Sequence, residues 1–84
     1  MTEHQVDVLH RANHINIRIN SEHYQVDVTS MTGLQIKQLA GIAAGNHLFV
    51  DTPGNGDDEQ ILDDRVVELR SGMAFYDVPV GNLG

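Results

Sequence analysis

The sequence has no cysteine and no tryptophan, and only two of its 84 residues are proline. Without cysteine it can form no disulfide framework, no thiolate metal site and no cysteine nucleophile. Positive charge is also scarce, because five Lys and Arg face twelve Asp and Glu, which leaves a formal net charge of −7. Such a chain repels phosphate backbones and anionic headgroups, so we expect neither nucleic acid nor a membrane as a partner.

Long hydrophobic runs are missing as well. No stretch approaches the roughly 18 apolar residues of a membrane-spanning helix, and the first residues lack the pattern of a signal peptide. The 40% apolar residues suffice for one small core, whereas 84 residues are too few for separate cofactor and substrate domains. No Ser, His and acid arrangement can be argued as a triad. We therefore expect a cytoplasmic protein that is not an enzyme.

Alternating residues predict a β-hairpin near the start of the chain. Residues 1–13 show no clear period, and we expect them to form a flexible segment. Polar residues then alternate with three isoleucines, a period of two that is typical of a half-buried strand. These isoleucines are Ile15, Ile17 and Ile19. Turn residues at 20–22 and a second alternation over 24–28 complete the predicted hairpin.

One helix is predicted after the hairpin. Thr32 and Gln35 have the spacing of a capping box, in which two side chains satisfy backbone amides at a helix start. We expect an apolar stripe of 3.6-residue period on the buried face, formed by Ile36, Leu39, Ala40 and Ala43. Lys37 and its polar neighbours are expected on the exposed face, and the helix is expected to end at Gly41 or Gly45.

The second half of the chain predicts further strands around an acidic loop. The strands are expected over residues 48–50, 66–69 (as a short strand or a turn) and 73–80. Residues 51–64 predict a loop that Ile61 and Leu62 fix to the core. The element order favours an α+β fold, in which one helix packs across one face of a mixed sheet of four or five strands. Residues 81–84 are expected to form a flexible tail.

Several short sequence motifs follow one another along the predicted strands and helix. They are Ile15-Asn16-Ile17-Arg18-Ile19-Asn20, Tyr24-Gln25-Val26, Thr32-Gly33 leading into Ile36 to Gly41, Asp63-Asp64 before Val66-Val67-Glu68-Leu69, and Gly72-Met73-Ala74-Phe75. Together they resemble the prokaryotic multiubiquitin family of ubiquitin-like modifiers, and the resemblance covers about residues 14–80. It implies the ubiquitin-like β-grasp fold. The chain departs from the family in having one domain, not a tandem array, and in ending with Leu83-Gly84, not a double glycine.

The resemblance implies a covalent modifier of other proteins. In the family, the C-terminal glycine carboxylate, here that of Gly84, is adenylated by an activating enzyme, passed as a thioester to a conjugating enzyme and attached to target proteins. A deconjugating or processing protease and a bacterial pathway, in some cases of phage defence, are implied as well. The activating enzyme uses ATP, so the resemblance implies no cofactor bound by this chain.

The C-terminal residues fit this chemistry independently of the resemblance. A carboxylate that threads through a narrow tunnel to a nucleotide needs a residue without Cβ, preceded by residues that can extend. Gly84 meets the first requirement, and Gly81, Asn82 and Leu83 meet the second. The alternative is chance, because glycine is a common residue at any position.

Three further features are candidates for binding. Lys37 is the only lysine, so it is either a self-acceptor for isopeptide bonds or a solubilising helix residue. Phe49 and Tyr76 are candidates for an outer sheet face that docks a partner, although Phe49 could equally lie in the core. A docking face for a basic surface of the activating enzyme, or a merely solvated loop, is predicted from Asp57, Asp58, Glu59, Asp63 and Asp64.

Metal binding is not expected. His10 and His14 have a spacing that brings two imidazoles together on a helix, but the residues from His14 onward predict a strand. The acidic stretch does not have the ligand order of a calcium loop.

Two other function classes stay open. A β-grasp sulfur carrier also uses an adenylated terminal glycine, which becomes a thiocarboxylate, although such carriers usually end in a double glycine. A non-covalent interaction module would dock a partner through its sheet, and Gly84 would then be incidental.

Overall fold

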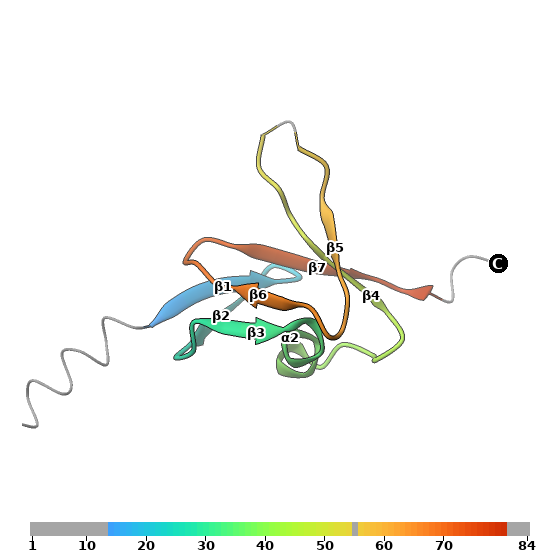
Figure 1. Cartoon of the computed structure of the whole chain (residues 1–84), viewed down its shortest axis with the longest axis horizontal. Coiled ribbons are helices and arrows are strands. Elements are labelled where there is room, and N and C mark those ends of the chain that lie inside the picture. The colour runs from blue at the N-terminus through green and yellow to red at the C-terminus, as the bar shows by residue number, and fades with distance from the viewer. Residues whose placement is uncertain (1–13, 55, 81–84) are drawn as a thin grey trace, which may run out of the picture.

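The computed structural model describes residues 14–54 and 56–80, which form seven strands and one helix (Figure 1). In chain order these are β1 (Ile15–Ile19), β2 (Glu22–Val26), β3 (Ser30–Thr32), α2 (Gly33–Ala40), β4 (His47–Val50), β5 (Glu59–Ile61), β6 (Val66–Glu68) and β7 (Ala74–Val78).

Five of the strands form one mixed sheet in the order β2-β1-β7-β4-β5, and α2 lies against one face of it (Figure 1). The first and last strands, β1 and β7, are parallel neighbours, while the other pairs of the sheet are antiparallel. Strands β3 and β6 form a separate antiparallel pair. A mixed sheet with one helix on one face confirms the predicted α+β, ubiquitin-like β-grasp architecture.

The core lies between the sheet and α2. It consists of the buried residues Ile17, Ile19, Ile36, Leu48, Ile61, Val67, Leu69 and Phe75. The inward residues of β1 are the predicted isoleucines, so the period-two interpretation of this strand is confirmed. Both sheets contribute to the core, because Val67 comes from β6.

The predicted hairpin is present and has a two-residue turn. Ile19 pairs with Glu22, so only Asn20 and Ser21 connect the strands, and their φ angles are 53° and 73°. Positive φ at both central residues is what a type I′ hairpin turn requires, and asparagine tolerates it better than most residues. The second strand is shorter than predicted, because Val28 lies beyond it and is 48% exposed.

The capping box of α2 is confirmed in both directions. The Thr32 Oγ1 atom accepts a hydrogen bond from the Gln35 N–H at 3.1 Å, and the Thr32 N–H donates to Gln35 Oε1 at 2.9 Å. The helix ends at Gly41, one of the two glycines at which its end was expected. Gly41 adopts a left-handed φ of 71° and caps the C-terminus of the helix.

The predicted buried stripe of the helix is wrong in part. Leu39 is 39% exposed, and Ala43 lies beyond the helix on the surface. The face toward the core instead carries Gly33, Ile36, Lys37 and Ala40. These positions follow the i, i+3, i+4, i+7 spacing of one helix face. A glycine and a lysine occupy two of them, so the buried face cannot be recognised from apolar residues alone.

Two strands were not expected from the sequence. Residues 59–61 form β5, which pairs with β4 and buries Ile61, so this part of the predicted loop is a sheet edge. Leu62 does not fix the segment to the core, because it is 60% exposed. Residues 30–32 form β3, whose partner β6 confirms the strand interpretation of residues 66–69. The last strand is β7, and it is shorter than the predicted 73–80.

Candidate functional site

The outer face of the sheet carries an aromatic pair. In β4 the buried Leu48 faces the core, so Phe49 points to the opposite side, and it pairs directly with Tyr76 of β7. The two rings stack with centroids 5.5 Å apart and planes 10° apart. Neither residue belongs to the core cluster or packs against it. The structure thus places Phe49 on the outer face, and the alternative in which Phe49 lies in the core is wrong.

Three further residues lie beside the aromatic pair on the outer face of the sheet. Register and alternation put His47 and Gln60 beside Phe49 on the outer face, and Val78 next to His47 across the strand pair. His47 Nδ1 and Gln60 Nε2 share a hydrogen bond of 2.9 Å. We call this surface the outer-face patch, and define it by Phe49, Tyr76, Val78, His47 and Gln60. A cluster of aromatic and aliphatic side chains with a polar rim is typical of a protein-binding surface.

Asp58 fixes the loop between β4 and β5 to this patch. The Tyr76 hydroxyl donates a hydrogen bond of 2.6 Å to Asp58 Oδ2, and the Thr52 N–H donates one of 2.9 Å to Asp58 Oδ1. These donors favour the ionised carboxylate, so the Tyr76 bond, followed by the Thr52 bond, lowers the pKa of Asp58. The same bond to Asp58, with some desolvation, raises the pKa of Tyr76.

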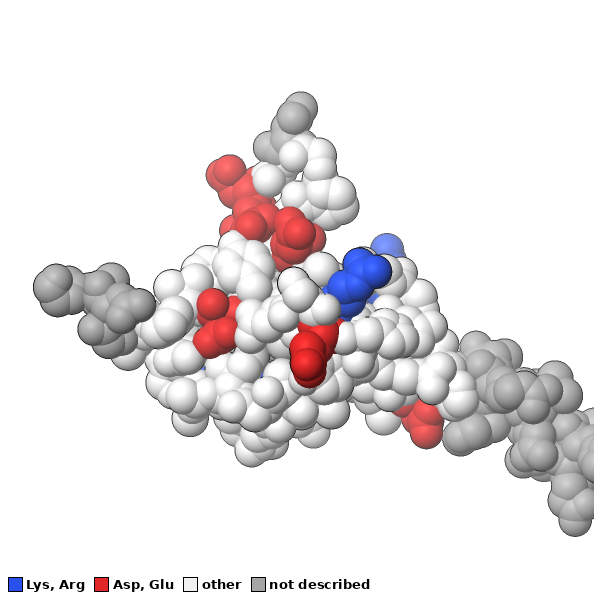
Figure 2. Space-filling view, turned by 180° about the vertical axis from the view of Figure 1, so that it is seen from behind, with Lys and Arg blue, Asp and Glu red and all other residues white. Residues whose placement is uncertain are grey.

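The five acidic residues of the predicted docking face do not lie together. Asp57 and Asp58 belong to the loop that projects between β4 and β5, where red side chains gather in Figure 2. Glu59 begins β5 and forms an ion pair of 2.8 Å with Arg65. Asp63 and Asp64 follow β5, and Asp63 contacts the helix through an ion pair with Lys37. The structure therefore brings only the first part of the acidic stretch near the outer-face patch.

The largest difference from the expected site is the burial of Lys37. It was expected on the exposed face of the helix, but it is 3% exposed. Both sequence interpretations assumed an exposed side chain, and that assumption is wrong. The reason is that its position is four residues after Gly33 on the face toward the core, where backbone carbonyls and Asp63 supply partners for the ammonium group.

The remaining candidates lie outside the described residues. These are Gly81, Asn82, Leu83 and Gly84, together with His10 and the rest of the segment 1–13. Among residues 14–54 and 56–80, no three His, Asp or Glu side chains lie close enough together to hold a metal ion. Over the same residues, no helix is long and apolar enough to cross a membrane.

The mixed five-stranded sheet with α2 on one face defines a ubiquitin-like protein domain. The family model of multiubiquitin matches residues 15–77, which is nearly the whole described domain, so the chain belongs to the multiubiquitin family. Comparisons with curated proteins and with solved structures gave no match.

Proposed function

We propose that the chain is a covalent protein modifier. The carboxylate of Gly84 is adenylated by an activating enzyme that uses ATP, passed as a thioester to a conjugating enzyme and joined to an amine of a target protein. A protease removes or processes the modifier, and the reactions take place in the cytoplasm. The observation that carries the proposal is the membership of residues 15–77 in the multiubiquitin family.

The position of the last strand supports this proposal. β7 lies at the centre of the sheet, between β1 and β4, and the described chain leaves it through the exposed residues Val78, Pro79 and Val80. Val78 is also part of the outer-face patch. An enzyme that binds the patch therefore contacts the strand from which residues 81–84 continue, which reduces the entropic cost of placing the carboxylate in its active site.

The charges near the patch favour a basic enzyme surface. Asp57 and Asp58 lie in the adjoining loop, and Asp51 directly follows β4. With a formal net charge of −7, the whole chain also presents a negative field to an approaching partner. Complementary charge accelerates association more than it strengthens the final complex, so the acidic loop fits a role in rapid encounter with the activating enzyme.

Mapping the linkage in conjugates tests the proposal. The modifier would be incubated with ATP, its activating and conjugating enzymes and cell extract, and the products digested with trypsin. Because Arg70 is the last basic residue of the chain, a modified lysine would carry residues 71–84, joined through the Gly84 carboxyl group. A matched chain without Gly84 serves as the control.

Three outcomes separate the function classes. Target lysines that carry residues 71–84, and only with the complete chain, support the modifier. A Gly84 thiocarboxylate without conjugates would identify a sulfur carrier instead. Enzyme binding that survives removal of Gly84, with no adduct of either kind, would identify a non-covalent module.

A further inference from the structure

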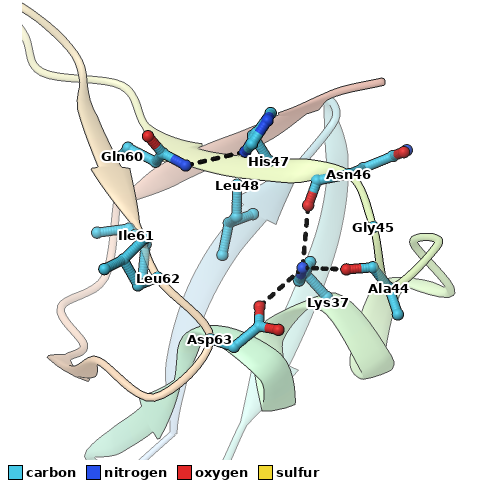
Figure 3. A pocket seen from close by; sticks show the side chains of 10 residues that line it. All are labelled: Lys37, Ala44, Gly45, Asn46, His47, Leu48, Gln60, Ile61, Leu62 and Asp63. Carbon is cyan, nitrogen blue, oxygen red and sulfur yellow. Dashed lines mark hydrogen bonds and ion pairs between the residues drawn. The ribbon is translucent and has the colours of Figure 1, made fainter. Parts of the chain in front are cut away.

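The only lysine of the 84 residues is closed off by its own domain. Lys37 Nζ donates hydrogen bonds to the backbone oxygens of Ala44 at 2.7 Å and Asn46 at 2.9 Å, and it pairs with Asp63 Oδ1 at 2.7 Å (Figure 3). An ammonium group has three N–H donors, so these three acceptors use all of them. The Lys37 side chain is only 4% exposed.

The acceptors come from two segments that are held in place independently of Lys37. Ala44 and Asn46 belong to the connection between α2 and β4, where Asn46 also donates a side-chain hydrogen bond of 2.7 Å to Asp77. Asp63 belongs to the connection between β5 and β6, which is joined to the start of α2 by the bond from the Leu34 N–H to the Asp63 carbonyl oxygen at 3.0 Å. The site is therefore assembled by the fold, and the lysine fills it.

Withdrawing the lysine from this site is unfavourable. The carbonyl oxygens of Ala44 and Asn46 would lose a charged donor, and the aliphatic part of Lys37 would leave the core-facing side of α2. Hydrogen bonds to charged groups are among the stronger ones in proteins. Asp63 is half exposed, so water can replace the lysine on that carboxylate, but not all of the lost contacts are recovered in this way.

Isopeptide bond formation needs a lysine nitrogen that can reach the thioester of a second protein. The neutral ε-amine attacks the thioester carbonyl of a charged modifier, the new C–N bond forms, the C–S bond breaks, and the enzyme thiol leaves with the proton that the amine gives up. The attacking nitrogen must offer its lone pair to a carbonyl outside the domain. Lys37 does not meet this requirement, because its side chain is buried and its nitrogen is bound to two backbone oxygens and to Asp63 of its own domain.

We infer that Lys37 is a structural lysine that the folded domain withholds from modification. Resting on the proposed function, this inference means that the domain does not extend chains of its own copies through lysine. An acceptor for a second copy must be an amine other than Lys37. Each copy of the domain would then be attached to a target without a further copy on its lysine, so lysine-linked chains of this modifier would not form.

Chemical acylation tests the accessibility of Lys37 without any enzyme. The native protein would be treated with an N-hydroxysuccinimide ester of acetic acid, and acetylation would be followed by peptide mass spectrometry. The matched control is Gln38→Lys, which adds an exposed lysine at the next position of the same helix. Because acetylation of Lys37 requires local opening, we expect it to be at least about tenfold slower than at the introduced lysine. Equal rates in the folded protein would overturn the inference.

A second variant tests the role of the ion pair. Asp63→Ala removes one of the three partners of Lys37 and should accelerate its acetylation, while a urea titration shows whether the domain is still folded. If the folded variant shows no change in rate, Asp63 does not help to withhold Lys37. The comparison with Gln38→Lys decides the main inference even if Asp63→Ala does not fold.

A conjugation assay then tests the consequence for chain formation. With ATP and the activating and conjugating enzymes, Lys37→Arg should give the same products as the native protein, and Gln38→Lys should gain a two-copy product. A two-copy product that disappears in Lys37→Arg would contradict the inference, whereas copies joined through another amine would support it. If no variant forms an enzyme-bound thioester, the proposed function fails, and the acetylation result still decides whether Lys37 is withheld.

Discussion

Tyr76 and Asp58 are joined by a hydrogen bond of 2.6 Å between the phenol hydroxyl and the carboxylate, although 18 positions separate them in the sequence. Tyr76 lies on the central strand β7, and Asp58 lies in the loop that projects beyond β4 and β5. The bond therefore connects the most acidic part of the loop with the outer-face patch. It also keeps a negative charge beside the stacked rings of Phe49 and Tyr76.

Replacing Tyr76 by phenylalanine should raise the pKa of Asp58 toward its ordinary value. The change removes the hydrogen bond that contributes most to the lowered pKa, while an aromatic ring remains opposite Phe49. An NMR titration of the Asp58 carboxyl carbon measures the effect. Tyr24→Phe is the matched control, because it removes the hydroxyl bonded to Glu22 and should leave the Asp58 titration unchanged. An unchanged Asp58 pKa in Tyr76→Phe would show that the Thr52 amide alone is sufficient.

The same bond predicts how stability depends on pH. The pKa of Asp58 is lower in the folded state, so its contribution is present above the unfolded-state pKa and disappears as the pH falls through the folded-state pKa. Tyr76 has the opposite sign, because its pKa is raised and its contribution disappears as the pH rises through that value. Urea midpoints across the acidic and alkaline ranges should therefore decline less steeply for Tyr76→Phe than for the native protein. Parallel curves would contradict this prediction.

Removing the helix cap should destabilise the domain moderately. Thr32→Ala eliminates the Oγ1 acceptor of the Gln35 N–H, and the measured cost of such caps is about 0.5 to 2 kcal/mol. Urea denaturation measures the loss as a lower midpoint with an unchanged slope. Thr32→Ser keeps the hydroxyl and should recover most of the stability. If both variants unfold at the same midpoint, the cap is not the cause of the loss.

Adding a methyl group at Gly33 should be more harmful than adding one at Gly45. A Cβ at Gly33 would clash with the carbonyl oxygen of Leu62 and lie 3.1 Å from Ile61 Cγ2, so the backbone after β5 must move. We expect Gly33→Ala to cost about 1 to 3 kcal/mol. A Cβ at Gly45 meets no atom within 4 Å, so Gly45→Ala should stay within about 1 kcal/mol of the native protein. Similar midpoints for both variants would contradict the close packing of α2 against residue 62.

Truncating Phe49 should weaken binding to the activating enzyme. The ring lies at the centre of the outer-face patch, and central aromatic residues commonly dominate the binding energy of an interface. We expect Phe49→Ala to lower the affinity at least about fivefold, measured by titration calorimetry with the enzyme. The control is Gln25→Ala, on the edge strand β2 away from the patch, which should bind with the native affinity. Equal affinities would place the docking surface elsewhere.

Local patterns predicted much of the fold from the sequence. The alternation of isoleucines in β1, the hairpin turn at Asn20, and the capping box of Thr32 and Gln35 each depend on residues within a few positions of one another. The orientation of Phe49 follows from alternation once the side occupied by Leu48 is known. The family resemblance then supplied the arrangement of these elements, which the match to residues 15–77 supports.

Features that depend on distant partners could not be predicted. β5 is a strand because β4 lies beside it, and nothing in the acidic residues before Gln60 has a strand pattern. The burial of Lys37 depends on Asp63, which is 26 positions away, and on backbone carbonyls that carry no sequence signal. A lone lysine among polar neighbours is therefore easily taken for a surface residue. The only hint in the sequence was the spacing, because Lys37 is four positions after Gly33 and one after Ile36, on one face of a helix.

The most direct test of the modifier function is the intact mass of the activating enzyme after incubation with ATP and this protein. We predict an enzyme adduct that carries one copy of the complete chain, is released by a thiol reagent and is absent when Gly84 is removed. The truncated chain should still show the native urea midpoint, because the strands and the helix of the described residues lie within residues 15–78. An active enzyme that forms no adduct with the complete chain, or forms the same adduct without Gly84, would contradict the account.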